Sequence, residues 1–189
     1  MVCKILLLNQ KGGVGKTTLA DEISFALSRR GFSVAFISID SQGGQSNQLC
    51  TDEAVALSSD FMVIDTAGVL KDDTEKWCLE ADIILVPVLP SSRDIHPTLR
   101  TINLIRSSQT RAKFYVLVNQ FYSFGILDRE LMEFFEAENI DVLEKIPRSV
   151  ALSQAAAREI SVAEFDPKNH VVPVLESITD KLLEISQTV

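Results

Sequence analysis

The residues with the clearest chemistry lie in the stretch NQKGGVGKTT, residues 9–18. Gly12, Gly13 and Gly15 carry no Cβ atom, so the backbone N–H groups around them can turn toward the oxygens of a phosphate group. Lys16 would neutralise the β- and γ-phosphates, and Thr17 would bind magnesium. This chemistry predicts that the chain binds the phosphates of a nucleotide together with Mg2+. The residues expected to contact the nucleotide here are Gly12, Gly13, Val14, Gly15, Lys16, Thr17 and Thr18.

The spacing departs from an ordinary phosphate-binding loop at one position. The ordinary loop is a glycine, four further residues and then Gly-Lys-Ser/Thr, which would place a glycine at position 10. That position is Gln10, and a second lysine, Lys11, follows it. Either Lys11 is a solvated surface residue, or the loop is of a different kind.

Buried strands must position this loop, and six apolar runs of strand length alternate with helical patterns. The runs are Val2–Leu8, Val34–Ile39, Phe61–Ile64, Ile83–Val88, Phe114–Val118 and Val142–Ile146. The helical patterns are Thr18–Arg30, a short one near Gln45–Leu57, Thr74–Glu80, Ile95–Ser108, Leu127–Glu138 and Val174–Ile185. The runs are continuous rather than alternating, which indicates strands buried on both faces. This order predicts an α/β fold, a mostly parallel twisted sheet flanked by helices in three layers.

In such a sheet ligands bind beyond the carboxyl ends of the strands. The stretch Gln10–Thr17 follows the first predicted strand. Asp40, Asp65 and Asn119 end the second, third and fifth strands. We therefore expect these residues to gather around one site.

The composition indicates a single globular domain, residues 1–189. No apolar run approaches the roughly 20 residues that cross a bilayer, and the first residues do not form a signal peptide. We therefore expect a cytoplasmic protein. A net charge of −8 argues against a generally basic nucleic-acid-binding surface, though not against a local basic face. The three cysteines lack paired spacing and are expected to be reduced structural thiols.

The segment KGGVGKTT, residues 11–18, resembles the deviant Walker A motif of the ParA/MinD family of ATPases, in which a lysine precedes the two glycines. The resemblance implies a P-loop NTPase that forms an ATP-dependent homodimer. In this dimer Lys11 would reach across to the phosphates bound by the other subunit. A second cation on the transferred phosphoryl group acts like an arginine finger, which is worth roughly 10³ to 10⁵ in rate.

Two later segments extend the resemblance and imply further site residues. Residues 37–44 are similar to the second conserved block of the family, where Asp40 takes the place of the catalytic aspartate. Asp40 would orient the attacking water and could also contact the metal ion. Residues 61–68 look like the Walker B strand, which would bring Asp65 to the magnesium shell, while residues 66–68 would sense the γ-phosphate. For both aspartates the alternative is a structural role in capping a helix or, for Asp40, forming a turn.

Shorter matches cover the rest of the chain. Residues 81–91 resemble the proline-rich strand and turn of the dimer interface in small plasmid-partition ATPases, although Pro87 and Pro90 could equally serve only to break the strand. Asn119 resembles the asparagine that contacts the base, and Pro147 lies in a loop that resembles the one beside the adenine. Only 24 residues separate Asp40 from Asp65. This is fewer than the family usually has, so we expect a strand and a helix to be missing or reduced at one edge.

The resemblance implies a ParA-type ATPase with weak basal turnover that a ParB-like adaptor protein stimulates. Its ATP-bound dimer would bind nonspecific nucleoid DNA and position a plasmid, chromosome or other cargo. Candidate DNA contacts are Arg93, Arg100, Arg106, Arg111, Lys113, Arg148, Arg158 and Lys168, which form at best a loose patch. The alternatives are an ATP-dependent enzyme or metallochaperone of the same superfamily, or a MinD-like membrane-positioning ATPase. Isolated His96 and His170 argue against metal delivery, and the acidic final helix argues against membrane binding.

Overall fold

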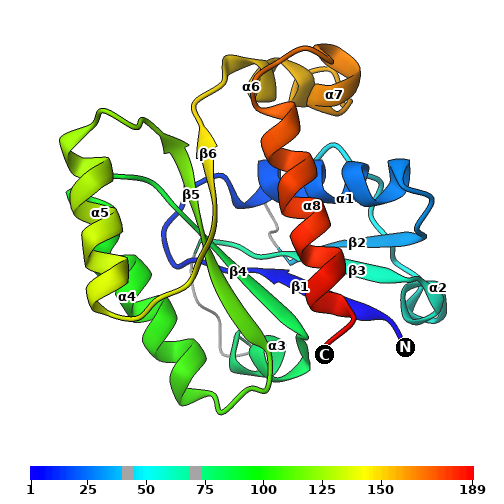
Figure 1. The fold of residues 1–189 in the computed structure, drawn as a ribbon. Helices are drawn as coiled ribbons and strands as arrows, with labels where there is room; N and C mark the ends of the chain where they lie inside the picture. The colour runs from blue at the N-terminus through cyan, green and yellow to red at the C-terminus, as the bar shows by residue number, and fades with distance from the viewer. Residues whose placement is uncertain (40–44, 69–73) are drawn as a thin grey trace.

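The computed structural model describes residues 1–39, 45–68 and 74–189, which form one sheet with helices on both faces (Figure 1). All neighbouring strands of the six-stranded sheet are parallel, in the order β2-β3-β1-β4-β5-β6. The strands are β1 (Cys3–Leu7), β2 (Val34–Ser38), β3 (Phe61–Asp65), β4 (Ile83–Val88), β5 (Lys113–Phe121) and β6 (Val142–Pro147). The predicted α/β fold is therefore confirmed.

The strands are apolar throughout because both faces of the sheet are covered. In β1, the side chains of Ile5 and Leu7 enter the core on one face, and that of Leu6 enters the core on the other. This alternation follows from the period of two residues along a strand. Continuous apolar runs are therefore what a three-layer sheet requires.

The helices divide between the two faces. Helices α1 (Lys16–Arg29), α6 (Val150–Ala156), α7 (Val162–Phe165) and α8 (Val172–Ser186) pack on the face of Ile5. Helices α2 (Glu53–Ser58), α3 (Thr74–Glu80), α4 (Ser92–Ser107) and α5 (Ile126–Ala137) pack on the face of Leu6. Among the described residues, no helix is long and apolar enough to cross a membrane.

The structure differs from the prediction at two places near the carboxyl edge of the sheet. Pro87 does not break β4, because it pairs with Leu117 in β5. Its backbone oxygen accepts a hydrogen bond from the side chain of Asn9 at 2.7 Å, just past the end of β1. Strand β5 continues beyond Asn119 to Phe121 through an irregular register.

Helices α6 and α7 were not predicted. Helix α6 is only 7 residues long, and its start is capped by the Ser149 hydroxyl, which accepts a hydrogen bond from the N–H group of Ala151. A serine before the apolar spacing Ala151, Leu152 and Ala155 was a usable signal.

The region between the two aspartates is described only from residue 45 onward. There Leu49 forms a single bridge to Phe36 of β2, and the 6-residue helix α2 follows. Strand β2 lies at the end of the sheet order. Residues 40–44 lie outside the described part of the chain, so the reduced edge stays a prediction.

Candidate functional site

The glycine-rich loop joins β1 to α1 and turns sharply at two glycines. Gly13 has a φ of 78° and Gly15 a φ of 98°, a left-handed backbone conformation that side chains with a Cβ rarely adopt. Val14 lies between them and is fully buried, which fixes the loop to the core. Helix α1 begins at Lys16. Its first N–H groups and the positive end of its dipole therefore face the loop and can bind an anion.

Two glycines of the site are required by close packing. A Cβ atom on Gly15 would lie 2.3 Å from Nδ2 of Asn119, and one on Gly68 would lie 2.9 Å from the backbone of Gly12. The Asn119 amide donates a hydrogen bond to the backbone oxygen of Val14 at 2.9 Å. The structure thus brings Asn119 against the glycine loop, as the sequence predicted.

Lys16 bends back over the loop. Its Nζ donates a hydrogen bond to the backbone oxygen of Lys11 at 3.1 Å, and the residue is only 7% exposed. The ammonium group therefore lies against the loop, where it can neutralise phosphate charge.

Thr17 and Asp65 meet as a candidate magnesium site. The Thr17 hydroxyl donates a hydrogen bond of 2.7 Å to Oδ2 of Asp65, the buried last residue of β3. A hydroxyl and a carboxylate are the hard oxygen donors that Mg2+ takes, with water and phosphate oxygens filling the other positions. No cluster of three or more acidic, histidine or cysteine side chains that could hold a metal occurs within the described ranges. This donor set fits Mg2+ bound together with a nucleotide.

Asp40 and residues 66–68 were also predicted to take part in the site. Asp40 lies outside the described residues, so its catalytic and metal roles stay predictions. In the predicted γ-phosphate sensor, the Thr66 hydroxyl donates a hydrogen bond to the backbone oxygen of Leu7 at 2.7 Å. This bond ties the end of β3 to the end of β1.

Lys11 points out of its own loop toward helix α4. Its Nζ lies 4.0 Å from Oδ1 of Asp94, a buried residue in the first turn of α4. Burial raises the pKa of Asp94, and the positive charge of Lys11 acts in the opposite direction. The Lys11 side chain remains 42% exposed, so its ammonium group can reach solvent or a second molecule.

A buried asparagine, Asn9, whose role was not predicted from the sequence, links the start of the glycine loop to helix α4. The Asn9 amide donates to the Thr98 hydroxyl at 3.2 Å, and its Oδ1 accepts from the backbone N–H of Lys11 at 3.0 Å. Asn9 is fully buried. The only signal for this role was an uncharged polar residue directly after an apolar run.

A cavity of about 290 Å³ lies beside the glycine loop and has the position expected for a nucleoside. Its wall includes Gly13, Thr18 and Asn119 on one side. Ser149 and Ser153, at the start of and within α6, line it as well and were not predicted. Pro147 lines a neighbouring hollow instead, so its contact with the adenine stays a prediction.

Comparisons with known proteins agree with this geometry. Residues 5–162 match the family described as CobQ/CobB/MinD/ParA nucleotide binding domain. The chain is 28% identical over 190 residues to maintenance of carboxysome distribution protein A of Halothiobacillus neapolitanus, covering 85% of this chain and 87% of that protein.

Solved structures show the same fold at low sequence identity. The apo form of McdA from Cyanothece has a TM-score of 0.78 at 15% identity, covering 98% of this chain and 99% of the other. A putative plasmid partition protein of Borrelia burgdorferi bound to AMPPNP has a TM-score of 0.78 at 16% identity, covering 97% and 99%. The cell division protein MinD of Aquifex aeolicus has a TM-score of 0.78 at 19% identity, covering 97% and 98%.

Proposed function

Since the chain belongs to the CobQ/CobB/MinD/ParA family of nucleotide-binding domains, we propose that it is a ParA-type ATPase that positions a cargo. In this proposal ATP and Mg2+ hold two copies together, and the dimer binds nonspecific DNA. An adaptor protein then stimulates hydrolysis to ADP and phosphate. The observation that carries the proposal is the position of Lys11, which is half-exposed and held outside its own loop by Asp94.

The glycine loop and the residues around it each contribute to ATP binding. The N–H groups of the glycine loop and of the start of α1 bind phosphate oxygens, and Lys16 neutralises their charge. Thr17 and Asp65 hold Mg2+, which supplies further charge neutralisation when it is bound. Asn119 and the first turn of α6 border the nucleoside.

Two lysines give the site its proposed dependence on a second subunit. Lys16 serves the phosphates of its own chain, whereas Lys11 serves those of the other chain, where it stabilises the charge of the transition state. Asp40 would orient the attacking water. A monomer would then lack one cation of its complete site, so we expect its basal turnover to be weak.

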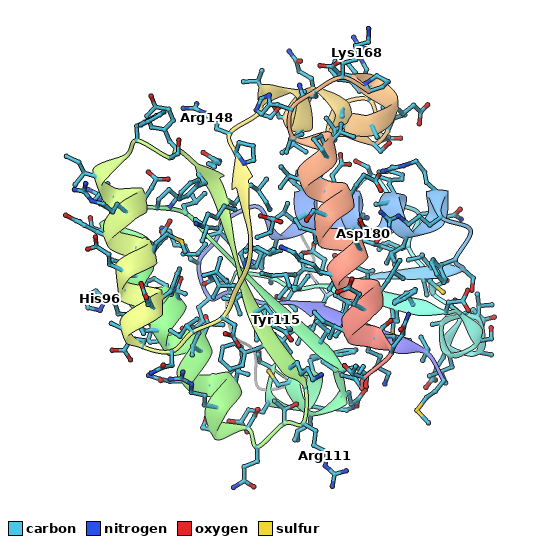
Figure 2. The ribbon with its side chains drawn as sticks, viewed as in Figure 1. His96, Arg111, Tyr115, Arg148, Lys168 and Asp180 are labelled. Carbon is cyan, nitrogen blue, oxygen red and sulfur yellow. The ribbon has the colours of Figure 1, made fainter. Side chains whose placement is uncertain are left out.

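The structure separates the candidate DNA contacts into groups. Arg106 lies over the ring of Phe114 and Arg158 over that of Phe165, so both guanidinium groups have contacts within the fold. Figure 2 shows Arg148 and Lys168 near α6 at one end of the molecule, and Arg111 at the opposite end. The eight candidates therefore do not form one patch. Arg148 lines the nucleoside cavity and the neighbouring hollow, whereas Lys168 lines neither, so Lys168 is the stronger candidate.

The names of the relatives support cargo positioning in general. One relative maintains carboxysome distribution, another is a putative plasmid partition protein, and MinD of Aquifex aeolicus was solved in complex with MinC. A large protein assembly or a plasmid is thus a candidate cargo, and a separate protein is a candidate adaptor. In the proposed function the chain acts in the cytoplasm, and its binding to DNA associates it with the nucleoid.

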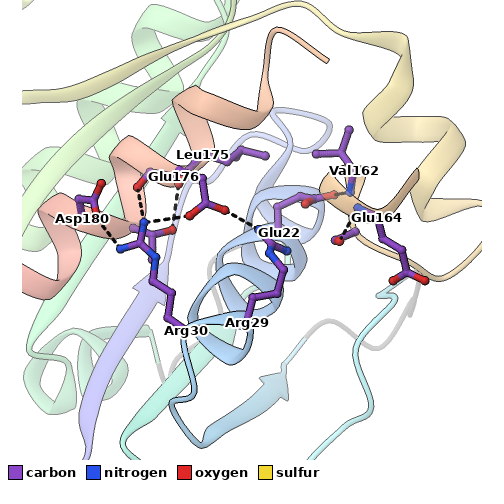
Figure 3. A network of polar contacts seen from close by, with 10 residues as sticks. Glu22, Arg29, Arg30, Val162, Glu164, Leu175, Glu176 and Asp180 are labelled. Atoms are coloured by element: carbon purple, nitrogen blue, oxygen red, sulfur yellow. Dashed lines mark hydrogen bonds and ion pairs between the residues drawn. The ribbon is translucent and has the colours of Figure 1, made fainter. Parts of the chain in front are cut away.

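Membrane binding through the last helix is disfavoured by its packing. Leu175, Ile178 and Leu182 of α8 lie in the core. On its polar side, Glu176 pairs with Arg29 at 2.7 Å and with Arg30 at 2.8 Å (Figure 3). Helix α8 would have to leave α1 before it could lie on a lipid surface.

The deciding experiment is binding to nonspecific duplex DNA in a salt titration, with ATP, with ADP and without nucleotide. We expect tight binding only with ATP, and weaker binding as the salt concentration rises. Lys168→Ala should weaken binding and reduce the salt slope by about 1. Arg111→Ala is the matched control and should bind like the wild type. Equal or absent binding in all nucleotide states would overturn the DNA part of the proposal.

A further inference from the structure

The loop between β5 and α5 and the first two residues of α5 expose four large apolar side chains at the carboxyl edge of the sheet. Tyr122 is 64% exposed, Phe124 85%, Ile126 65% and Leu127 47%. The rings of Tyr122 and Phe124 meet edge to face with their centroids 5.9 Å apart. Contiguous apolar surface of this kind marks a binding site more often than a free surface.

The turn that carries these side chains is specifically built. The N–H of Gly125 donates to the backbone oxygen of Tyr122 at 2.8 Å, and the N–H of Tyr122 donates to Oδ1 of buried Asp128 at 2.6 Å. A Cβ atom at position 125 would lie 2.1 Å from Oδ2 of Asp128, so a larger residue there would displace the carboxylate that holds the turn. The aromatic pair is therefore held in solvent by a fixed backbone, which lowers the entropy lost on binding.

A hollow of about 670 Å³ lies directly beside this pair. Leu89, Pro90, Phe121 and Pro147 supply apolar side chains to its wall, which Tyr122 also lines. Gln120 and Arg148 line both this hollow and the nucleoside cavity. A molecule that filled the hollow would thus border a bound nucleotide.

We propose that this face is a docking surface for a second copy of the chain, with Tyr122 and Phe124 of each copy entering the hollow of the other. A two-fold interface uses the same patch on both subunits, so the projection and the hollow that receives it must lie on one face. This chain has both, side by side. The inference rests on the proposed function, because it specifies where the ATP-bound dimer makes apolar contact.

Charge favours a second copy as the occupant. The chain carries a net charge of −8, so the repulsion between two copies is weakest where their contact surfaces lack acidic groups. Among the described residues that line the hollow and the nucleoside cavity, none is Asp or Glu. A stable dimer buries roughly 800 Å² on each partner. Four side chains cannot supply this area, so the contact would continue across the edge of the sheet toward Lys11.

The test is sedimentation velocity with AMPPNP and Mg2+ over a range of protein concentrations. Phe124→Ala and Tyr122→Ala should weaken dimerisation by roughly tenfold or more, as for aromatic residues at the centre of an interface. Leu79→Ala is the matched control, because Leu79 is 58% exposed but lies on α3. All three variants should bind AMPPNP as monomers with the affinity of the wild type.

A second measurement, of tryptophan fluorescence, reports on the environment of position 124 itself. In Phe124→Trp combined with Trp77→Phe, the emission of the one remaining tryptophan should move to shorter wavelength when AMPPNP drives dimer formation. Unchanged emission in a dimer, or dimers of Phe124→Ala and Tyr122→Ala as tight as those of the wild type, would overturn the docking surface and leave the ATP-dependent dimer intact. A wild type that stays monomeric with AMPPNP would instead overturn the dimer of the proposed function, and the docking surface with it.

Discussion

The ammonium nitrogen of Lys11 lies 4.0 Å from a carboxylate oxygen of Asp94, and the two residues differ sharply in exposure. The Asp94 side chain is 3% exposed and that of Lys11 is 42% exposed. Burial raises the pKa of Asp94, and Lys11 opposes that rise. In the proposed dimer Lys11 must leave this carboxylate to reach the phosphates of the other subunit.

We predict that Asp94→Asn strengthens dimerisation with AMPPNP. Leaving Asp94 costs Lys11 an ion pair, and pairs that are partly exposed are worth roughly 0.2–1 kcal/mol. The dimer should therefore become tighter by up to about fivefold in sedimentation equilibrium. Lys11→Ala in the same assay should abolish the dimer. A weaker dimer for Asp94→Asn would mean that Asp94 presents Lys11 rather than restraining it.

The two lysines of the loop should separate nucleotide binding from dimer formation. Lys16→Ala removes the ammonium group that lies against the loop, so titration calorimetry should show loss of ATP binding. Lys11→Ala should keep ATP binding yet lose turnover. ATP binding that survives Lys16→Ala would contradict the phosphate-loop assignment, and an unaffected dimer for Lys11→Ala would contradict its action on the other subunit.

The hydroxyl of Thr17 should make ATP binding depend on magnesium. Thr17→Ala removes the group that lies 2.7 Å from Asp65, so added Mg2+ should no longer strengthen ATP binding. Thr17→Ser keeps the hydroxyl and should retain the magnesium effect. The comparison is a calorimetric titration with ATP in Mg2+ and in EDTA, and an undiminished magnesium effect in Thr17→Ala would remove this residue from the metal site.

Substitution of Gly15, with Gly31 as the control, tests the packing of the loop. Gly15→Ala combines a φ of 98° with a Cβ atom 2.3 Å from Asn119, so we expect loss of ATP binding as the loop shifts. Gly31 also has a positive φ, 87°, but a Cβ atom there would meet nothing within 4 Å. Gly31→Ala should cost about 1 kcal/mol of stability and leave ATP binding unchanged. Equal ATP binding in both variants would show that the contact with Asn119 is not needed.

The sequence predicted the fold and the centre of the site well, because both depend on local patterns. Continuous apolar runs predicted the six strands, and the position of Thr17 and Asp65 after two of them predicted that both would lie at one site. Asn9 and Asp94 could not be predicted in this way, since their roles arise from contacts with residues far along the chain. Asn9 bonds to Pro87 and Thr98, and Asp94 lies beside Lys11 only because α4 packs near the carboxyl edge of the sheet.

The burial of Glu22 predicts that the stability of the protein depends on pH, which no sequence pattern indicated. This residue of α1 is 4% exposed, and its Oε1 accepts a hydrogen bond from the N–H of Val162 in α7 at 2.8 Å (Figure 3). Burial is the main cause that raises the pKa of Glu22 from 4.5 to about 7, and Asp21 adds to the rise. The bond from Val162 and the charge of Arg29 act in the opposite direction.

The sign of the effect follows from proton binding. Between pH 4.5 and about 7 the folded chain holds a proton on Glu22 that the unfolded chain has lost, so the free energy of unfolding falls as the pH rises through this range. The loss is at most about 3 kcal/mol. Glu22→Gln keeps the acceptor for Val162 and removes the charge, so urea unfolding should show a flatter pH profile and a more stable protein at pH about 8. Glu133→Gln, on an exposed side chain of α5, is the matched control and should keep the slope of the wild type. A Glu22→Gln profile parallel to that of the wild type would show that Glu22 is charged in the folded protein across this range.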